Sequence, residues 1–128
     1  MKRASFFAAC SLFLACLVLN GCTGGKAERS YAVQVNGDPR HGKELIQAYG
    51  CGACHIIPGV RSARGVVGPP LNLFGERTMI AGELPNTPEN LVRWLENPSV
   101  VESGTAMPDL GLTPDQAYDV AAYLYTLR

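Results

Sequence analysis

Five consecutive residues, Cys51-Gly52-Ala53-Cys54-His55, constrain this chain more than any other stretch. Two cysteines separated by two residues and followed at once by a histidine form the attachment pattern of c-type haem. Each thiol can add across one vinyl group of the porphyrin. The two thioether bonds then fix the ring beside the backbone, so that the imidazole of His55 meets the iron as the proximal ligand. The pattern therefore predicts one covalently bound haem c and a fold that surrounds it.

Two other kinds of site use a similar cysteine pair. A structural zinc ion takes four ligands, commonly from two cysteine pairs or from a cysteine pair and a histidine pair. No second cysteine pair follows Cys54, and His41 is the only other histidine. A thioredoxin-like redox pair lies in a βαβ setting, and the sequence shows no such alternation. Both sites stay open as alternatives, although the sequence favours haem.

Residues 1–21 have the pattern of an export signal. Lys2 and Arg3 give a positive start, and a mostly apolar run follows over residues 4–19. This run is shorter than the roughly 20 apolar residues that span a bilayer as a helix, but it has the length of a signal-peptide core. We therefore expect residues 1–21 to be a cleaved signal peptide and the mature chain to lie outside the cytoplasm.

The end of this segment resembles a bacterial lipoprotein box. In Leu19-Asn20-Gly21-Cys22, an aliphatic residue stands three positions before a cysteine and a small residue directly precedes it. The resemblance implies that Cys22 is lipidated and becomes the mature N-terminus. Ordinary cleavage nearby and an uncleaved anchor are the alternatives. Residues 22–37 are then expected to be a lipidated N-terminus and a flexible tether, which holds the protein on the periplasmic side of a bacterial membrane.

These expectations account for all five cysteines of the chain. Cys10 and Cys16 leave with the signal peptide, Cys22 takes the lipid, and Cys51 and Cys54 take the haem. An odd cysteine count in an exported protein would otherwise leave an unexplained thiol. Export also agrees with covalent haem, which is attached outside the cytoplasm.

Residues 38–128 are expected to form one all-α domain with three main helices. Each helix begins with a capping residue followed by proline, a typical helix start, and apolar residues recur behind each start at helical spacing. We predict that the first helix ends before Gly50 and that the second ends at Asn97-Pro98, because residues before proline avoid helical conformations. The three starts are Asp38-Pro39, Thr87-Pro88 and Thr113-Pro114.

The segment between the first two helices has a different composition. Residues 56–86 contain nine glycines or prolines and show no long helical or strand pattern. An irregular segment of this length is uncommon in a compact domain unless it has a specific role. We expect it to wrap around the haem, with Leu71 packing either on the porphyrin or in the general core.

Met107 is the candidate for the second axial ligand. It lies in Gly104-Thr105-Ala106-Met107-Pro108, between the second and third helices and far from His55 in sequence. A loop bounded by glycine and proline can present a ligand from the other face of the haem, and a thioether stabilises ferrous iron. Met79 and His41 are weaker candidates, and core packing is the usual role of a lone methionine.

With these features, the domain resembles a class I bacterial cytochrome c, and it is particularly similar to the small cytochrome c domains that serve haem-copper oxidases. The matching stretches follow one another in the expected order along the domain. They are residues 49–55, Gly68-Pro69-Pro70-Leu71, residues 91–98, residues 104–108 and Ala122-Tyr123-Leu124.

The resemblance implies roles for further residues. The carbonyl of Pro69 would accept a hydrogen bond from His55, and Arg77 would approach a haem propionate. Leu71, Trp94 and Leu95 would line the pocket, although a buried tryptophan is more often simply part of a core. The loop after Arg77 is shorter than in mitochondrial relatives, so the tryptophan that binds a propionate there has no counterpart in this chain.

The function implied is one-electron transfer without catalysis, in a respiratory chain that feeds a terminal oxidase. Expected partners are a terminal oxidase, a bc1-type complex or a dehydrogenase. The full chain has a formal charge of zero, so nothing indicates nucleic-acid binding. An enzyme or sensor with an open iron site is the alternative, and it would require Met107 to be absent from the iron. A structural lipoprotein without a redox role is a third hypothesis that the haem motif disfavours.

Overall fold

The computed structural model describes residues 33–128. The expected signal peptide, Cys22 and most of the expected tether therefore lie outside the described residues. Within the described part, no helix is long and apolar enough to cross a membrane.

The described chain is mostly helical, with two short 3₁₀-helices and one small hairpin. In chain order the elements are α1 (Pro39–Ala48), the 3₁₀-helix η1 (Cys51–Ala53), the 3₁₀-helix η2 (Phe74–Glu76), β1 (Met79–Ile80), β2 (Leu84–Pro85), α2 (Pro88–Glu96), α3 (Pro98–Val101) and α4 (Pro114–Leu124). The three expected helix starts are confirmed, because Asp38, Thr87 and Thr113 are the N-caps of α1, α2 and α4.

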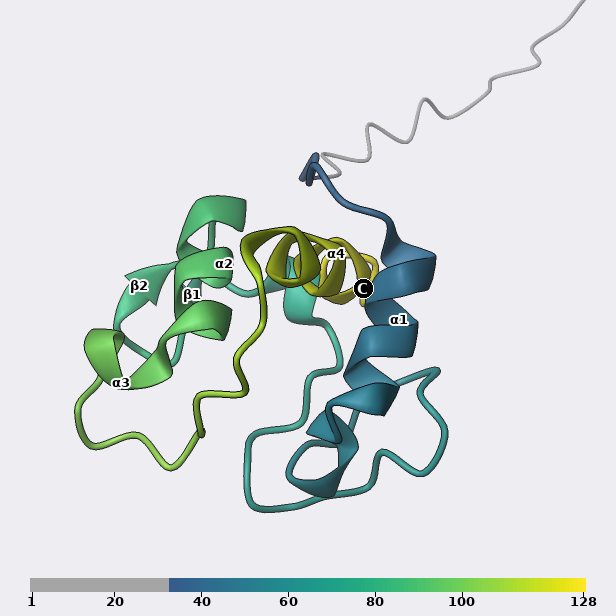
Figure 1. Cartoon of the computed structure of the whole chain (residues 1–128), viewed down its shortest axis with the longest axis horizontal. Helices are drawn as coiled ribbons and strands as arrows, with labels where there is room; N and C mark the ends of the chain where they lie inside the picture. The colour runs from purple at the N-terminus through teal and green to yellow at the C-terminus, as the bar shows by residue number, and fades with distance from the viewer. Residues whose placement is uncertain (1–32) are drawn as a thin grey trace, which may run out of the picture. The chain divides into compact units, whose positions relative to one another are not determined.

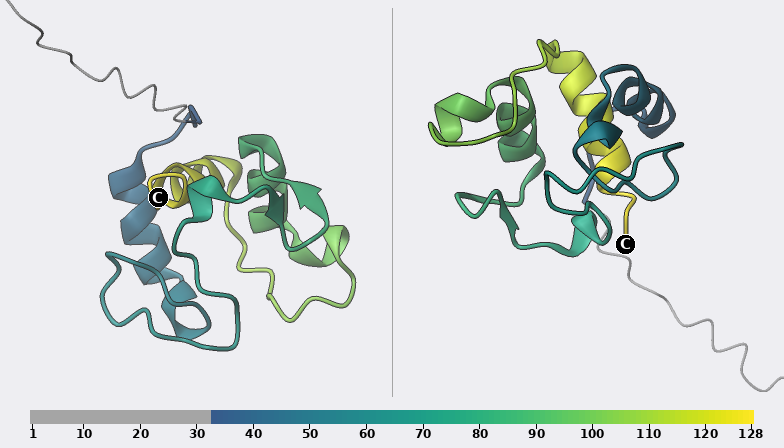
Figure 2. Two further views of the ribbon diagram at one scale, coloured as in Figure 1. Left: turned by 180° about the vertical axis from the view of Figure 1, so that it is seen from behind. Right: turned by 90° about the horizontal axis from the view of Figure 1, so that it is seen from below.

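Helix α4 occupies the centre of the fold. In Figures 1 and 2, α1 crosses one side of α4, while α2, α3 and the hairpin lie on the other side. A capping box is present at its start, since the Thr113 hydroxyl accepts from the Gln116 backbone and the Gln116 side chain accepts from Thr113 N. Its buried side includes Ala117, Val120 and Leu124, which form the core together with residues of α1 and α2.

The crossing of α1 and α4 depends on Gly42. A Cβ atom at this position would fall well within 3.0 Å of the Asp119 backbone, so only glycine permits the observed approach of the two helices. Helix α1 ends at Ala48, and Gly50 follows with φ +71°, a left-handed conformation that suits glycine.

Two elements differ from the sequence-based expectation. Asn97-Pro98 does end α2, but Pro98 then serves as the first residue of α3, a position that proline favours. The expected irregular segment also contains the hairpin of β1 and β2, with Met79 opposite Pro85 and Ile80 opposite Leu84. Elements of two to four residues are too short to produce a periodic pattern, which explains why the sequence did not indicate them.

Two long irregular segments lie on the same side of the helices in Figure 1. One covers residues 54–73, between η1 and η2, and the other covers residues 102–113, between α3 and α4. The first segment follows η1, which comes after α1, and the second segment ends at the start of α4. Both segments contribute residues to the cavity described next.

Candidate cofactor site

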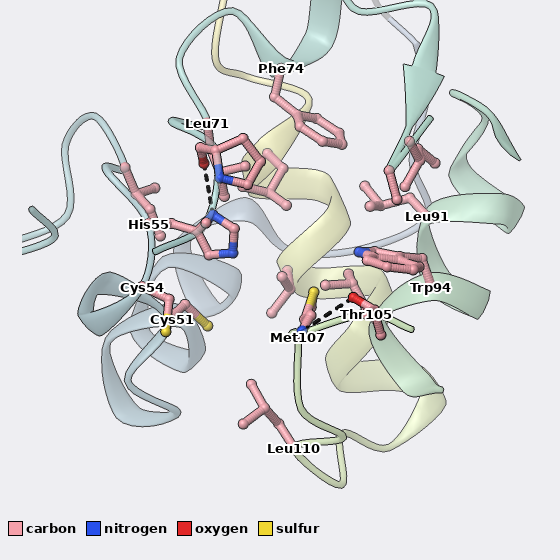
Figure 3. Close-up of a pocket in the computed structure, with 18 of the residues that line it drawn as sticks. Cys51, Cys54, His55, Leu71, Phe74, Leu91, Trp94, Thr105, Met107 and Leu110 are labelled. Atoms are coloured by element: carbon pink, nitrogen blue, oxygen red, sulfur yellow. Dashed lines mark hydrogen bonds between the residues drawn. The ribbon is translucent and has the colours of Figure 1, made fainter. Parts of the chain in front are cut away.

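A cavity of about 560 Å³ lies between these two irregular segments. Its volume falls in the range of sites for small molecules and cofactors, roughly 300–1,000 Å³. The lining is mainly apolar. In Figure 3, Cys51, Cys54 and His55 reach it from one side, Leu91 and Trp94 reach it from the other, and Met107 lies between them in this view. The fold thus gathers the residues of the haem motif and the candidate methionine around one apolar space.

The imidazole of His55 is held by the segment that follows it. Its Nδ1 lies 2.7 Å from the carbonyl oxygen of Pro69, which is the contact expected from the sequence (Figure 3). Because a carbonyl can only accept, Nδ1 carries the proton in the neutral ring, and Nε2 keeps a free lone pair for a metal. The backbone of this segment is fixed in turn, since Gly68 N donates to Cys54 O at 2.8 Å.

Gly68 is a site residue whose role the sequence analysis did not recognise. A Cβ atom on it would lie within 3.0 Å of three ring atoms of His55. The absence of a side chain therefore allows the backbone to lie directly against the imidazole. The sequence marked Gly68-Pro69-Pro70 only as part of a stretch that resembles the family. The contact between Gly68 and the His55 ring is visible only in the folded chain.

Cys51 and Cys54 lie at the start of the same segment, Cys51 within η1 and Cys54 directly after it, both half-buried. Burial raises the pKa of the Cys51 thiol above its ordinary value. Across residues 33–128, no group of three His, Cys, Asp or Glu side chains is arranged to hold a metal ion. This geometry gives no support to the zinc alternative.

The fold sets His41 apart from the other two candidates for a second ligand. Met107 is half-buried and lines the cavity, and its backbone N–H donates to the Thr105 hydroxyl at 3.2 Å. Met79 also lines the cavity but is 43% exposed. His41 lies elsewhere, on α1, with Nδ1 at 2.7 Å from a carboxylate oxygen of Asp119.

The other expected pocket residues also line the cavity. Leu71, Trp94 and Leu95 are among its walls, and Trp94 and Leu95 belong to the buried core as well. Arg77 borders the cavity, but its guanidinium donates to the backbone carbonyls of Pro70 and Asn72. Its approach to a propionate stays a prediction.

These residues fit a covalent haem. The possible donors that line this single apolar cavity are one imidazole with Nε2 free and the thioethers of Met107 and Met79 on other segments. Two thiols stand at the place where the haem motif requires them, next to the imidazole. An apolar cavity of this size is otherwise hard to explain in so small a domain, because interiors normally pack without large voids.

The comparison with known families agrees with this site. The family model of cytochrome c matches residues 40–128. The chain belongs to the cytochrome c family. Membership establishes one covalently bound haem c with its iron as the cofactor and the transfer of single electrons as the activity of the domain, as the sequence indicated.

Curated relatives narrow the kind of cytochrome. The chain is 33% identical over 88 residues to cytochrome c oxidase subunit 2 of Alkalihalophilus pseudofirmus, covering 68% of this chain and 25% of that protein. It is 35% identical over 89 residues to the same subunit of Bacillus sp. PS3, covering 66% and 25%. For Bacillus subtilis the values are 34% over 70 residues, 53% and 20%. The chain thus spans a quarter or less of the length of these relatives, and it is a class I c-type cytochrome related to oxidase domains.

Proposed function

We propose that this protein is a membrane-tethered one-electron carrier whose haem iron is held by His55 and Met107. The observation that carries this proposal is the shared cavity, which is bordered by the haem motif on one segment and by Met107 on the other. When bound, the haem supplies an iron that cycles between the ferric and ferrous states. The residues of the chain orient the ligands, exclude water and set the potential.

His55 and Met107 have complementary tasks in this proposal. The Pro69 carbonyl fixes the orientation of the His55 ring and increases its basicity as a ligand. The Met107 thioether is a soft donor that favours the reduced state and raises the potential. With His55 and Met107 both holding the iron, no coordination site would remain for small ligands, and the protein would transfer electrons rather than catalyse a reaction. The apolar walls keep water from the centre.

The proposed partners follow from the relatives and from the surface charge. The relatives are named as oxidase subunits, so we propose a terminal oxidase as the acceptor and a bc1-type complex or a dehydrogenase as the donor. Arg61 and Arg64 are exposed just after the haem motif, whereas acidic residues predominate from residue 84 onwards. This asymmetry would orient the encounter with a partner.

Carbon monoxide binding tests the proposed ligation. The full-length protein, produced with a c-type haem maturation system, is reduced and its absorption spectrum recorded before and after carbon monoxide is added. The wild type and the matched control Met79→Ala should keep their spectra, because both axial positions stay filled. Met107→Ala should bind carbon monoxide rapidly and show a lower reduction potential.

A second variant guards against the case in which Met107→Ala fails to mature. Met107→His supplies another ligand, so it should resist carbon monoxide but have a lower potential than the wild type. Rapid carbon monoxide binding by the wild type would contradict the carrier proposal and favour an enzyme or a sensor.

The lipid anchor is tested separately, because it rests on the sequence alone. In a bacterial host, the full-length protein should fractionate with membranes, and Cys22→Ser should move it to the soluble periplasmic fraction or leave the signal peptide uncleaved. Mass spectrometry of the mature N-terminus distinguishes these results. An unmodified Cys22 in the purified wild type would refute the anchor without affecting the proposed ligation.

A further inference from the structure

A hydrogen-bonded side chain connects the end of α4 to the wall of the haem cavity. Asn86 lies between β2 and α2, and its amide nitrogen donates to the carbonyls of Phe74 at 3.1 Å and Arg77 at 3.0 Å. Its amide oxygen accepts from the Tyr125 hydroxyl at 2.8 Å. Both amide hydrogens and the oxygen are therefore engaged, and the side chain fixes the two ends of η2 relative to α4.

Tyr125, the residue at the α4 end of this connection, is buried and packed against η2. It is only 4% exposed, and its ring packs edge-on against Phe74 with centroids 5.9 Å apart. Burial raises the pKa of Tyr125 to about 12, so the hydroxyl stays protonated and able to donate at any physiological pH. The residue directly follows α4, the central helix of the fold.

Arg77 connects η2 to the segment that contacts His55. Its guanidinium lies 5.5 Å from the centre of the Phe74 ring and donates to the carbonyls of Pro70 and Asn72. These two carbonyls belong to the segment that directly follows Pro69, whose own carbonyl accepts from His55. A continuous series of contacts therefore runs from Tyr125 at the end of α4 through Asn86 and Arg77 to the segment that holds the His55 imidazole.

We propose that Asn86 and Tyr125 are positioning residues for the proximal histidine. They hold η2 and Arg77 so that the Pro69 carbonyl stays directed at Nδ1 of His55. The proposal rests on the proposed function in one respect, namely that His55 is an axial ligand. Partners of a metal-bound histidine fix its orientation and tune its basicity, so a loosened Pro69 carbonyl changes the ligand itself.

The test measures how fast the Nδ1 proton of His55 exchanges with solvent, by NMR of the reduced, haem-loaded, full-length protein. Asn86→Ala and Tyr125→Phe each remove the hydrogen bond between these two side chains without changing any charge. Each should accelerate this exchange about tenfold, the scale expected for losing a partly buried hydrogen bond. Asn90→Ala is the matched control, because the Asn90 amide also donates to a nearby carbonyl, that of Pro85 at 2.9 Å, and not to a carbonyl of η2. It should leave the exchange rate within about twofold of the wild type.

The backbone amides of α1 and α4 are the internal reference, and they should keep their wild-type rates in each variant. The double variant should exchange no faster than Asn86→Ala, because the two residues act through one path. Unchanged Nδ1 exchange in both single variants, or equal acceleration of the α1 and α4 amides, would overturn the proposal. Tyr125→Phe keeps the ring and provides a result even where Asn86→Ala does not fold.

Measurements on the same protein distinguish a failure of the positioning role from a failure of the proposed ligation. A wild-type protein that resists carbon monoxide and shows a haem-shifted Nδ1 proton upholds the ligation, and unchanged exchange in its variants then refutes the positioning role alone. A wild-type protein without such a proton refutes both.

Discussion

Gly68 shows how a missing side chain sets the position of a functional one. The His55 ring lies where a Cβ atom of residue 68 would be, and the next residue, Pro69, provides the carbonyl that fixes the tautomer of the ring. The orientation of the imidazole is therefore decided by two adjacent residues, one through the lack of a side chain and the other through its backbone oxygen.

We expect Gly68→Ala to displace the imidazole and destabilise the haem-loaded protein. Overpacking of this kind costs about 1–3 kcal/mol, and the change in ligand orientation should also alter the reduction potential. Gly104→Ala is the matched control, because a Cβ atom at Gly104 would meet nothing within 4 Å, and it should stay within about 0.5 kcal/mol of the wild type. Denaturant unfolding and potentiometry measure both effects. Equal stability and equal potential for the two variants would contradict the steric argument.

At the scale of elements, the pairing of α1 with α4 determines where the haem motif lies. Helix α1 leads directly to η1 and the two cysteines, so its position on α4 sets the position of the attachment site. The Asp119 carboxylate on α4 adds two polar contacts, accepting from Asp38 N at 2.7 Å and lying 2.7 Å from His41 Nδ1. A shift of this crossing would therefore move the cysteines relative to Met107.

Two opposing effects decide the outcome of Gly42→Ala. Alanine is a better helix former than glycine by about 1 kcal/mol, but its Cβ atom would collide with the backbone of Asp119. A backbone inside a helix cannot move aside as a flexible side chain can, so the collision should prevail. We expect a net loss of about 2 kcal/mol in the free energy of unfolding, measured with urea.

Lys43→Ala is the neighbouring control for this prediction. Lys43 is exposed on the same helix, and its loss should change the stability by less than about 0.5 kcal/mol. A Gly42→Ala protein as stable as Lys43→Ala would show that α1 and α4 can separate without cost.

The molecule as a whole depends on a buried tyrosine that should limit its stability at high pH. Burial, with a smaller contribution from the Glu89 charge, raises the pKa of Tyr125 from its ordinary value of 10.0 to about 12. Between these values the unfolded chain loses a proton that the folded chain keeps. The stabilisation is thus complete below pH 10 and is lost as the pH rises toward 12.

We therefore expect the free energy of unfolding to fall between pH 9 and pH 11, and to fall less in Tyr125→Phe than in the wild type. Burial also raises the pKa of Tyr123, and that contribution is common to both proteins. Urea unfolding at the two pH values measures the difference. Parallel declines in the two proteins would show that Tyr125 does not titrate in this range.

Much of this protein was determined by its sequence alone. The haem motif defines the cofactor because two thiols and an imidazole at fixed spacing have few other uses, and the three helix starts are local because a cap, a proline and the apolar spacing act within a few residues. The match of the cytochrome c family to residues 40–128 confirms the cofactor. The roles assigned to Met107 and Cys22 stay predictions.

The tertiary structure alone decided the contacts between residues far apart in the chain. The hairpin and α3 are too short to leave a periodic signal, and the place of Gly68 against the His55 ring depends on how residues 56–71 fold back. The link from Tyr125 through Asn86 to Arg77 joins residues up to 48 positions apart. No local pattern specifies such contacts, because they form only when packing on α4 brings these segments together.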